Sequence, residues 1–225
     1  MRFDLMYESF FKILQGVPLT LEVVFISTFL GLGLAIIVAL MRISDNKILS
    51  IPAYSFIYLI RGTPLLLQLY FVYYGISQFS IVRESFLWPI LKEPFWCGII
   101  TLTISTGAYS AEIIRGGIQS VSQGYIESGK ALGLSRISIF LRIVMPITIR
   151  QALPAYGNEL ILMVKASSLI SIVTLMEITG IARTIISKTY APVEIFLVAG
   201  SIYLLINFII TRLVKYAEIR LSIPS

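Results

Sequence analysis

Five long runs of apolar residues dominate this sequence and limit how it can fold. A helix needs about 20 apolar residues to cross a bilayer, because each residue advances it by about 1.5 Å and the hydrocarbon core is about 30 Å thick. The backbone finds no water in that core, so a spanning segment must satisfy its own hydrogen bonds. We therefore expect an all-α membrane protein with five transmembrane helices at residues 18–41, 52–76, 95–117, 147–173 and 194–213.

The composition supports a membrane protein and excludes several kinds of site. Of the 225 residues 57% are hydrophobic and 13% charged, and the mean hydropathy of +0.89 is well above that of soluble globular proteins. The chain has no histidine and one cysteine, which excludes the common zinc, haem and Cys–His constellations and any internal disulfide. The net charge of +6 is the excess of Lys and Arg that cytoplasmic loops carry, so no nucleic-acid partner is expected.

The segments outside the spans predict peripheral structure. Apolar residues recur at helical spacing through residues 1–16, which is typical of an amphipathic interfacial helix, and the charged residues among them argue against a signal peptide. Residues 77–94 carry the aromatics and prolines of a membrane interface, and residues 174–192 are too short and polar to span. We expect residues 174–192 to pack on the outer face, residues 17–216 to form the membrane domain, and residues 217–225 to form a cytoplasmic tail.

One polar loop, residues 123–146, interrupts the apolar pattern. It places Ser128, Gly129 and Ala131 close together, so a short helix there can approach another surface closely. Gly133 can take a positive φ and reverse the chain. The alternative is a simple polar turn between two membrane helices.

The spacing within this loop resembles a signature of the permease subunits of bacterial ABC importers. That signature is E-A-A, three residues, G, nine residues and I-x-L-P. The matching residues here are Glu127, Ser128, Gly129, Gly133, Ile143, Met145 and Pro146, with three similar substitutions. The resemblance implies a coupling helix that docks in a groove of the ATPase subunit. Its expected docking residues are Tyr125, Glu127, Ser128, Gly129, Ala131, Leu132, Gly133 and Arg136.

Basic residues predict the orientation, since short cytoplasmic loops are enriched in Lys and Arg. If the polar loop lies inside, the amino terminus is outside and the carboxyl terminus inside, as five spans require. The inner basic set is Arg42, Lys47, Arg115, Lys130, Arg136, Arg142, Arg212, Lys215 and Arg220. The outer set, nearly balanced by acids, is Arg2, Lys12, Arg83, Lys92, Arg183 and Lys188.

A single charge, Arg61, lies inside the second span. A charge in the bilayer costs at least about 2.5 kcal/mol, so it should face protein or water. The glycine and proline of the run RGTP break the helix there and free backbone groups for a cavity. Arg61, assisted by Thr63, is a candidate clamp for a substrate carboxylate, because the guanidinium fork fits two oxygens. The alternative is an internal salt bridge to Glu112 or Glu159.

Polar residues also recur in the third and fourth spans. Tyr109 and Glu112 are three residues apart and share a helix face. Asn158 and Glu159 lie near mid-bilayer if the fourth span starts at the end of the polar loop. Opposite charges at similar depth indicate a site for a zwitterion, although hydrogen bonding between helices is an alternative. The candidate substrate residues are Arg61, Thr63, Gln68, Tyr109, Glu112, Asn158, Glu159 and Ser168.

As a set, the runs RGTPLLLQLYF, AYSAEIIRGG, the polar loop and NELILMVKASSL resemble the polar amino acid permeases of the histidine, glutamine and arginine type. The resemblance covers roughly residues 19–215 and implies the type I ABC importer fold. It also implies a bacterial inner-membrane complex of two permeases, identical or different, with two ATPase subunits and an extracytoplasmic amino-acid-binding protein. We lean to a basic amino acid such as arginine, lysine or histidine, because Glu112 and Glu159 could attract a positive side chain.

The chain itself is not expected to be an enzyme or to hold a cofactor. No Gly-rich phosphate loop ending in Gly-Lys-Ser/Thr occurs, so ATP and Mg²⁺ are expected on the partner ATPase. Pro154 and Gly157 predict an irregular fourth span, and Gly133 and Pro146 are candidate hinges. An ATP-independent channel or carrier is the alternative function. An intramembrane enzyme is disfavoured because the chain has no histidine and no evident nucleophile–base pair.

Overall fold

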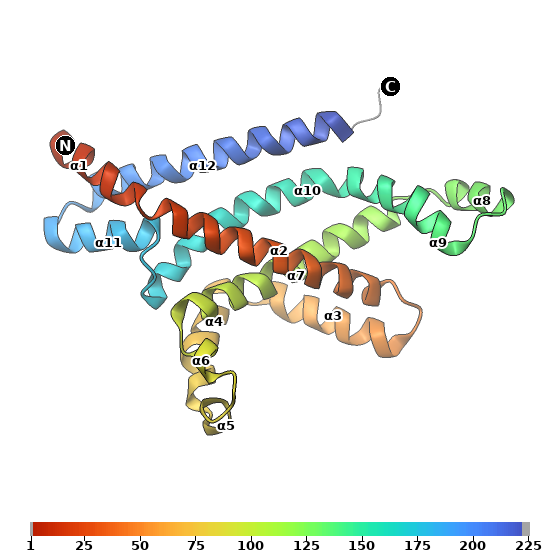
Figure 1. Cartoon of the computed structure of the whole chain (residues 1–225), viewed down its shortest axis with the longest axis horizontal. Helices are drawn as coiled ribbons and strands as arrows, with labels where there is room; N and C mark the ends of the chain where they lie inside the picture. Colours follow the sequence, from red (N-terminus) through yellow and green to blue (C-terminus); the bar gives the residue numbers. More distant parts are fainter. Residues whose placement is uncertain (1, 222–225) are drawn as a thin grey trace.

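The computed structural model describes residues 2–221, and the fold within them is built from helices without a strand (Figure 1). Four helical stretches are long and apolar enough to cross a membrane, and a bent helix pair makes a fifth candidate. The expected all-α architecture is confirmed. The long helices that lie along the bundle are α2 (Val17–Arg42), α7 (Pro94–Gln119), α10 (Met145–Ala166) and α12 (Pro192–Leu221).

Helices α2 and α7 interlock through one glycine from each. A Cβ added to Gly31 of α2 would lie 2.1 Å from the Thr106 methyl carbon and 3.2 Å from the Thr103 carbonyl oxygen of α7. A Cβ added to Gly107 of α7 would lie 2.7 Å from Cδ2 of Leu34 on α2. Small residues allow two membrane helices to approach closely and gain packing contacts where the hydrophobic effect cannot drive association.

The second expected span is broken, as the glycine and proline of RGTP predict. Helix α3 (Lys47–Gly62) stops before Thr63, which is extended because it precedes Pro64, and the chain then turns by 104°. Helix α4 (Leu65–Tyr70) continues through a π turn, η1 (Phe71–Gly75), and a 3₁₀ turn, η2 (Ile76–Gln78). The predicted continuous segment at 52–76 is therefore two segments in different directions.

A small helical excursion follows the bent pair. Helices α5 (Ser80–Arg83) and α6 (Trp88–Leu91) project from one side of the bundle before α7 begins (Figure 1). Neither helix contains a buried residue, and polar side chains gather over this projection. This segment covers most of the predicted interfacial segment, residues 77–94.

The fourth membrane segment begins earlier than expected and is more regular. Helix α9 (Arg136–Ile139) passes through a π turn, η3 (Phe140–Val144), into α10 without a stop at Pro146. Pro146 lacks an N–H, but it lies in the first turn of α10, where the hydrogen-bond pattern is already changing. Pro146, which the sequence suggested as a hinge, therefore does not break the helix.

The predicted irregularity at Pro154 and Gly157 is wrong, because α10 continues through both residues. A proline costs one backbone hydrogen bond, which a membrane helix tolerates. Gly157 instead permits contact with α12, since a Cβ there would lie 2.3 Å from Cγ1 of Val214. The irregular turn lies farther on, in the 3₁₀ helix η4 (Ser167–Val173).

The polar loop contains the short helix that the sequence predicts. Helix α8 (Gln123–Ala131) begins at Ser122, whose side chain accepts a hydrogen bond from the Gly124 N–H. The chain then reverses at Gly133, whose φ of +73° favours glycine. A Cβ on Gly129 would lie 3.0 Å from Cγ1 of Ile139. Gly129 thus provides close approach within this chain, whereas we expected it to face a partner.

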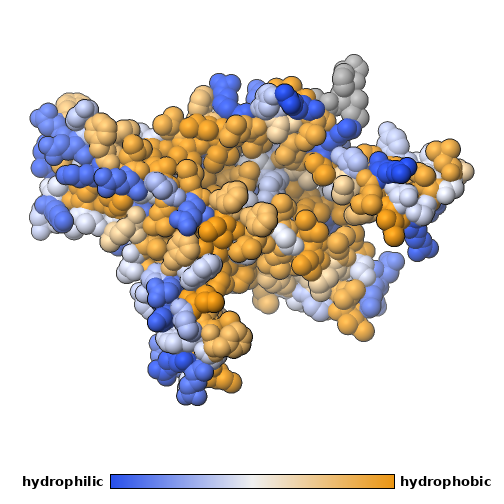
Figure 2. Space-filling view, in the orientation of Figure 1, coloured by the Kyte–Doolittle hydropathy of each residue, from blue (hydrophilic) through white to orange (hydrophobic). Residues whose placement is uncertain are grey.

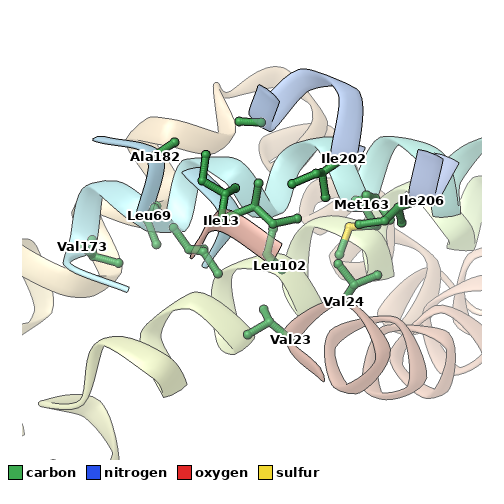
Figure 3. Packing of buried hydrophobic residues seen from close by; sticks show 14 of the residues in the cluster. Ile13, Val23, Val24, Leu69, Leu102, Met163, Val173, Ala182, Ile202 and Ile206 are labelled. Carbon is green, nitrogen blue, oxygen red and sulfur yellow. The ribbon is translucent and has the colours of Figure 1, made fainter. Parts of the chain in front are cut away.

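The first and last helices meet at the end of the bundle opposite α8. Helix α1 (Phe3–Leu14) packs on α12 and on α11 (Ile178–Thr189), which is short, as expected for residues 174–192. Fully buried Ile13 joins this core, which includes Leu102 of α7 and Ile202 of α12 (Figure 3). Helix α12 continues beyond the predicted end at 213, so the tail is helical as far as Leu221, and residues 222–225 lie outside the described residues.

Apolar side chains cover the middle of the molecule in Figure 2, and polar side chains gather toward its two ends. The amino terminus and α11 lie at one end, and α8, α9 and the carboxyl end of α12 lie at the other (Figure 1). This distribution is what a multi-pass membrane protein requires, since lipid contacts the middle and water the ends.

Substitution of the two glycines of α2 should give opposite results. Gly31→Ala is expected to destabilise the protein by about 1–3 kcal/mol, because the added methyl group overpacks the contact with α7. Gly33→Ala is the matched control, since a Cβ there meets nothing within 4 Å. Thermal unfolding of the detergent-solubilised protein measures both effects. Equal melting temperatures for the two variants would contradict the interlocking contact.

Candidate functional site

A water-accessible cavity of about 490 Å³ lies where α2, α3 and α7 meet. Arg42 is the last residue of α2, Arg61 lies one residue before the end of α3, and Glu112 lies on α7. The lining residues are Arg42, Tyr54, Ile57, Tyr58, Arg61, Gly62, Tyr109, Glu112 and Arg115. Charged and aromatic side chains thus gather in an open hollow at the surface of an otherwise apolar bundle, a setting that suits a polar ligand in a membrane protein.

The cavity brings together three of the predicted substrate residues, Arg61, Tyr109 and Glu112. The guanidinium carbon of Arg61 lies 5.1 Å from the centre of the Tyr109 ring, within the range of a cation–π contact. Among residues 2–221 Arg61 forms neither an ion pair nor a side-chain hydrogen bond. Its guanidinium N–H groups are therefore free to bind an acceptor, as a carboxylate clamp requires.

The expected salt-bridge alternative for Arg61 is not formed, because Glu112 pairs with a nearer arginine. The Glu112 carboxylate accepts hydrogen bonds from Arg115 Nη2 at 2.7 Å and from Arg115 Nε at 3.0 Å. The two residues are three apart on α7, so they are neighbours on one helix face. Glu112 therefore lies in the cavity with its charge already compensated.

Two other predicted residues, Thr63 and Gln68, bond to the backbone at the helix break. The Gln68 side-chain amide donates to the Ile60 carbonyl at 2.8 Å and to Thr63 Oγ1 at 2.9 Å. The Thr63 hydroxyl donates to the Leu59 carbonyl at 2.9 Å. The last carbonyls of α3 have no N–H partner within the helix, and these two side chains supply the missing hydrogen-bond donors. Neither residue lines the cavity.

The predicted residues of the fourth span lie outside the cavity lining. Asn158 is exposed on α10. Glu159 is only 6% exposed and lies within electrostatic range of Arg61. Ser168 donates to the Lys165 carbonyl in its own helical turn at 2.6 Å. Of these, Glu159 alone is placed within electrostatic range of a cavity residue.

Most of the predicted coupling residues form an exposed surface around α8. Tyr125 is 59% exposed and Leu132 is 79% exposed, which is unusual for apolar side chains that face water. Glu127, Ser128, Ala131 and Arg136 are exposed as well, and Gly129 is buried. A separate small core that includes Val121, Ile139 and Val144 fastens this surface to the bundle. The loop is therefore firmly attached and leaves an apolar face free.

Residues 31–223 match the family described as "Binding-protein-dependent transport system inner membrane component". The chain belongs to this family. It is a multi-pass permease component of an ABC importer, a translocation subunit and not an enzyme. Permeases of this kind work in the inner membrane with an ATPase and a binding protein. An independent channel or carrier and an intramembrane enzyme are thereby excluded.

Several relatives are permeases for amino acids or their derivatives. The nopaline transport system permease NocM of Agrobacterium fabrum is 53% identical over 97% of this chain and 91% of its own length. The octopine permease OccM of Rhizobium radiobacter is 51% identical over 95% of this chain and 87% of its own. The histidine/lysine/arginine/ornithine permease HisM of Escherichia coli is 38% identical over 91% of this chain and 87% of its own length.

Solved structures agree with this family. An amino acid ABC transporter crystallised with histidines is 33% identical and superposes with a TM-score of 0.87 over 98% of this chain and 99% of its own. The MetNI methionine ABC transporter, 16% identical with a TM-score of 0.78 over 95% of this chain and 97% of its own, shares the fold. The permease therefore has the type I ABC importer fold.

A buried carboxylate at the other end of the permease was not among the residues predicted from the sequence. Glu177, at the start of α11, is 0% exposed. It accepts a hydrogen bond from the Tyr203 hydroxyl at 2.6 Å and from the Gly180 N–H at 2.8 Å. The neighbouring Ile178 N–H donates to Thr20 of α2 at 3.4 Å. This network, the Glu177 knot, joins α2, α11 and α12. An acidic residue three positions before a glycine at the start of a helix is a capping pattern, and it could have pointed to Glu177 in the sequence.

The Glu177 knot should make stability depend on pH. Burial raises the pKa of the Glu177 carboxyl, and the hydrogen bond from Tyr203 acts in the opposite direction. A raised pKa means that the folded state binds the proton more tightly, so this contribution is complete below the unfolded pKa and is lost as pH rises through the folded pKa. Glu177→Gln is expected to flatten the fall in melting temperature as the pH rises above the usual range of a glutamate carboxyl.

Thermal unfolding of the purified permease complex at several pH values tests this expectation. Glu84→Gln is the matched control, because it removes an exposed carboxylate from the segment between α5 and α6. The control should keep the slope of the parent protein. An unchanged slope in Glu177→Gln would show that another group governs the pH dependence.

Proposed function

We propose that this permease is one of two in an importer that carries basic amino acids into the cytoplasm, and that Arg61 binds the substrate carboxylate. The observation that carries the proposal is a guanidinium that lacks an ion pair and a side-chain hydrogen bond among residues 2–221, in a cavity beside a broken membrane helix. Arg61 is exposed on the single chain, but a charge within a membrane span is costly unless protein, water or a ligand faces it, so its retention favours a ligand that supplies acceptors. The relatives named for histidine, lysine, arginine and ornithine support this substrate class.

The substrate side chain has aromatic partners in the same cavity. Tyr54 and Tyr58 line it beside Arg61 and are 51% and 67% exposed. A guanidinium or ammonium group over such a ring gains cation–π energy, about 0.5–2 kcal/mol depending on its hydration. The buried Glu159 carboxyl lies within electrostatic range of Arg61, outside the cavity lining. Glu112, which we expected to attract the side chain directly, acts mainly as the partner of Arg115.

The power for transport comes from an ATPase that docks on α8. Exposed Tyr125 and Leu132 provide apolar contacts, and Glu127 and Arg136 provide polar ones. In this proposal two ATPase subunits carry ATP and Mg²⁺, and their closure moves the membrane helices as rigid bodies. A binding protein on the far side delivers the substrate. The second permease is a copy of this chain or a paralogue.

We infer the orientation in the membrane from the same proposal. The end that carries α8 and the carboxyl end of α12 faces the cytoplasm, and the end that carries α1 and α11 faces outward. Basic residues outnumber acidic ones on the inner loops, in keeping with positive-inside placement. The amphipathic helix α1 then lies at the outer membrane surface.

Loss of the Arg61 fork should weaken substrate uptake. Arg61→Gln is expected to raise the KM for arginine uptake by reconstituted importer about 10–100-fold, because a charge-assisted contact contributes about 1.5–3 kcal/mol. Arg150→Gln is the matched control, since Arg150 is an exposed arginine of α10 outside the cavity. An unchanged KM in Arg61→Gln would show that another group binds the carboxylate.

Changes at the turn after α8 should separate transport from assembly in the membrane. Gly133→Val is expected to abolish ATP-driven uptake, because a β-branched residue at a φ of +73° costs about 1–3 kcal/mol and displaces the docking helix. Leu132→Ser removes an exposed apolar contact without removing a buried one, and it should weaken copurification with the ATPase.

The control for both variants is Gly124→Ala, because Gly124 lies on α8 and an added Cβ would make only an ordinary contact there, 3.7 Å from the Ser122 hydroxyl oxygen. It should retain uptake and copurification, and all three proteins should insert into the membrane. Normal uptake and normal copurification in both Gly133→Val and Leu132→Ser would count against α8 as the coupling helix.

A further inference from the structure

We propose that the carboxyl end of α12 carries a binding site for an anionic phospholipid, and that Arg212 and Arg220 bind its phosphate group. The site lies outside the substrate cavity and serves a different ligand. It rests on the orientation inferred above only for the leaflet that it occupies, which is the cytoplasmic one. Three features of α12 support it: the length of the helix, an exposed ladder of aromatic and basic side chains, and an uncompensated positive charge.

Helix α12 is longer than the hydrocarbon core of a bilayer is thick. Its 30 residues extend for about 45 Å, whereas the core is about 30 Å thick. Glu194 in the first turn marks the outer end of the apolar run, and about 20 residues from Ile195 reach Val214. Arg212 therefore lies at the inner edge of the core. Arg220 lies about 12 Å farther along the helix axis, in the headgroup layer.

Four exposed side chains at four-residue intervals, Phe208, Arg212, Tyr216 and Arg220, form what we call the α12 ladder. Residues four apart are neighbours on a helix surface. The guanidinium carbon of Arg212 lies 5.0 Å from the centre of the Phe208 ring, and that of Arg220 lies 5.0 Å from the centre of the Tyr216 ring. Each guanidinium is thus held over a ring that lies one turn nearer the membrane centre. This holds both charges close to the level of the lipid phosphates, since neither side chain extends away into water.

The α12 ladder faces away from the rest of the protein. Its rings Phe208 and Tyr216 are 53% and 56% exposed. Val214 lies on the opposite side of the helix, where it packs closely on Gly157 of α10. Nearer the membrane centre, the exposed side of α12 continues with apolar side chains that suit lipid tails, namely Leu204, Leu205 and Ile209. A lipid whose tails cover these residues therefore brings its headgroup to the arginines of the ladder.

The charge at this end of α12 favours an anionic headgroup. From Arg212 to Leu221 there are three basic residues, Arg212, Lys215 and Arg220, and one acid, Glu218, a net charge of +2. Within residues 2–221 the three basic side chains form no ion pair. A guanidinium fork binds two phosphate oxygens at once. A zwitterionic lipid carries its own cation beside the phosphate, whereas an anionic lipid brings the net negative charge that this surface lacks, worth about fivefold in affinity for each basic residue.

Lipid binding to the delipidated permease–ATPase complex in detergent tests this inference. The probes are dioleoylphosphatidylglycerol and dioleoylphosphatidylcholine, which share their acyl chains and phosphate and differ in net charge, and native mass spectrometry counts the bound molecules. We expect the parent complex to bind phosphatidylglycerol about tenfold more tightly than phosphatidylcholine. The double variant Arg212→Gln/Arg220→Gln should lose most of this preference and keep the melting temperature of the lipid-free complex, because both side chains are exposed.

Two further double variants control for net charge and for folding. Arg83→Gln/Arg183→Gln removes two exposed arginines, one from α5 and one from α11, and changes the net charge by the same amount. It should retain the preference for phosphatidylglycerol. Arg212→Lys/Arg220→Lys keeps the positive charges of the ladder but loses the forks, so it should retain part of the preference.

Three outcomes would overturn the lipid site. The first is equal affinity of the parent complex for the two lipids. The second is an unchanged preference in Arg212→Gln/Arg220→Gln, because another surface would then bind the headgroup. The third is an equal loss in Arg83→Gln/Arg183→Gln, because net charge alone would then govern lipid binding. None of these outcomes bears on the role of Arg61, which is measured by arginine uptake, so the proposed function and the lipid site fail separately.

Discussion

The packing of α2 on α7 is the contact on which the cavity depends. Gly31 accepts the side chain of Thr106, and Gly107 accepts that of Leu34, so each helix is fixed against the other in register. The two helices run in the same direction, and from this contact both lead toward the cavity. Arg42 lies about 16 Å along α2 from Gly31, and Glu112 lies about 8 Å along α7 from Gly107, at about 1.5 Å per residue. A shift of one turn would separate the charges that now share one hollow.

The break after α3 makes that hollow possible. A straight second span would continue past Gly62 and carry Arg61 along a packed helix face. The extended Thr63 and the 104° turn end the helix there instead, and the cavity lies beside the end of α3. Gln68 and Thr63 bind the carbonyls left open by the break, so the break is stabilised from within the chain. A rigid break of this kind positions a charged group without exposing unpaired backbone to lipid.

The sequence predicted the long elements well because membrane spans depend mainly on local hydropathy. The expected span at 18–41 is α2 (Val17–Arg42), and that at 95–117 is α7 (Pro94–Gln119). The helix break beside Arg61 was also predictable, since glycine and proline act locally. The prolines of the fourth span do not interrupt the helix as the sequence suggested, because the effect of a proline depends on its place in the hydrogen-bond pattern, as at Pro146.

The partners of charged side chains were harder to predict, because several pairings suit the same sequence. Glu112 could pair with Arg61 from another helix or with Arg115 three residues away, and the local pairing is the one formed. Arg42 looked like a loop residue because it follows an apolar run, and the packing of α2 against α3 and α7 brings it into the cavity. Glu177 lay in a segment too polar to attract notice, and its burial results from contacts made by α11 and α12.

The fourth span is one continuous helical stretch, so it can carry a displacement from one end of the permease to the other. From Arg136 to Val173 the chain is helical over 38 residues, and neither Pro146 nor Pro154 interrupts it. This stretch begins beside α8, where we propose that the ATPase docks, and ends close to the Glu177 knot at the opposite end of the permease. A continuous helix resists bending more than a hinged one, so displacement at one end moves the other. Because α10 packs on both α7 and α12, such a movement would reach the cavity and the knot together.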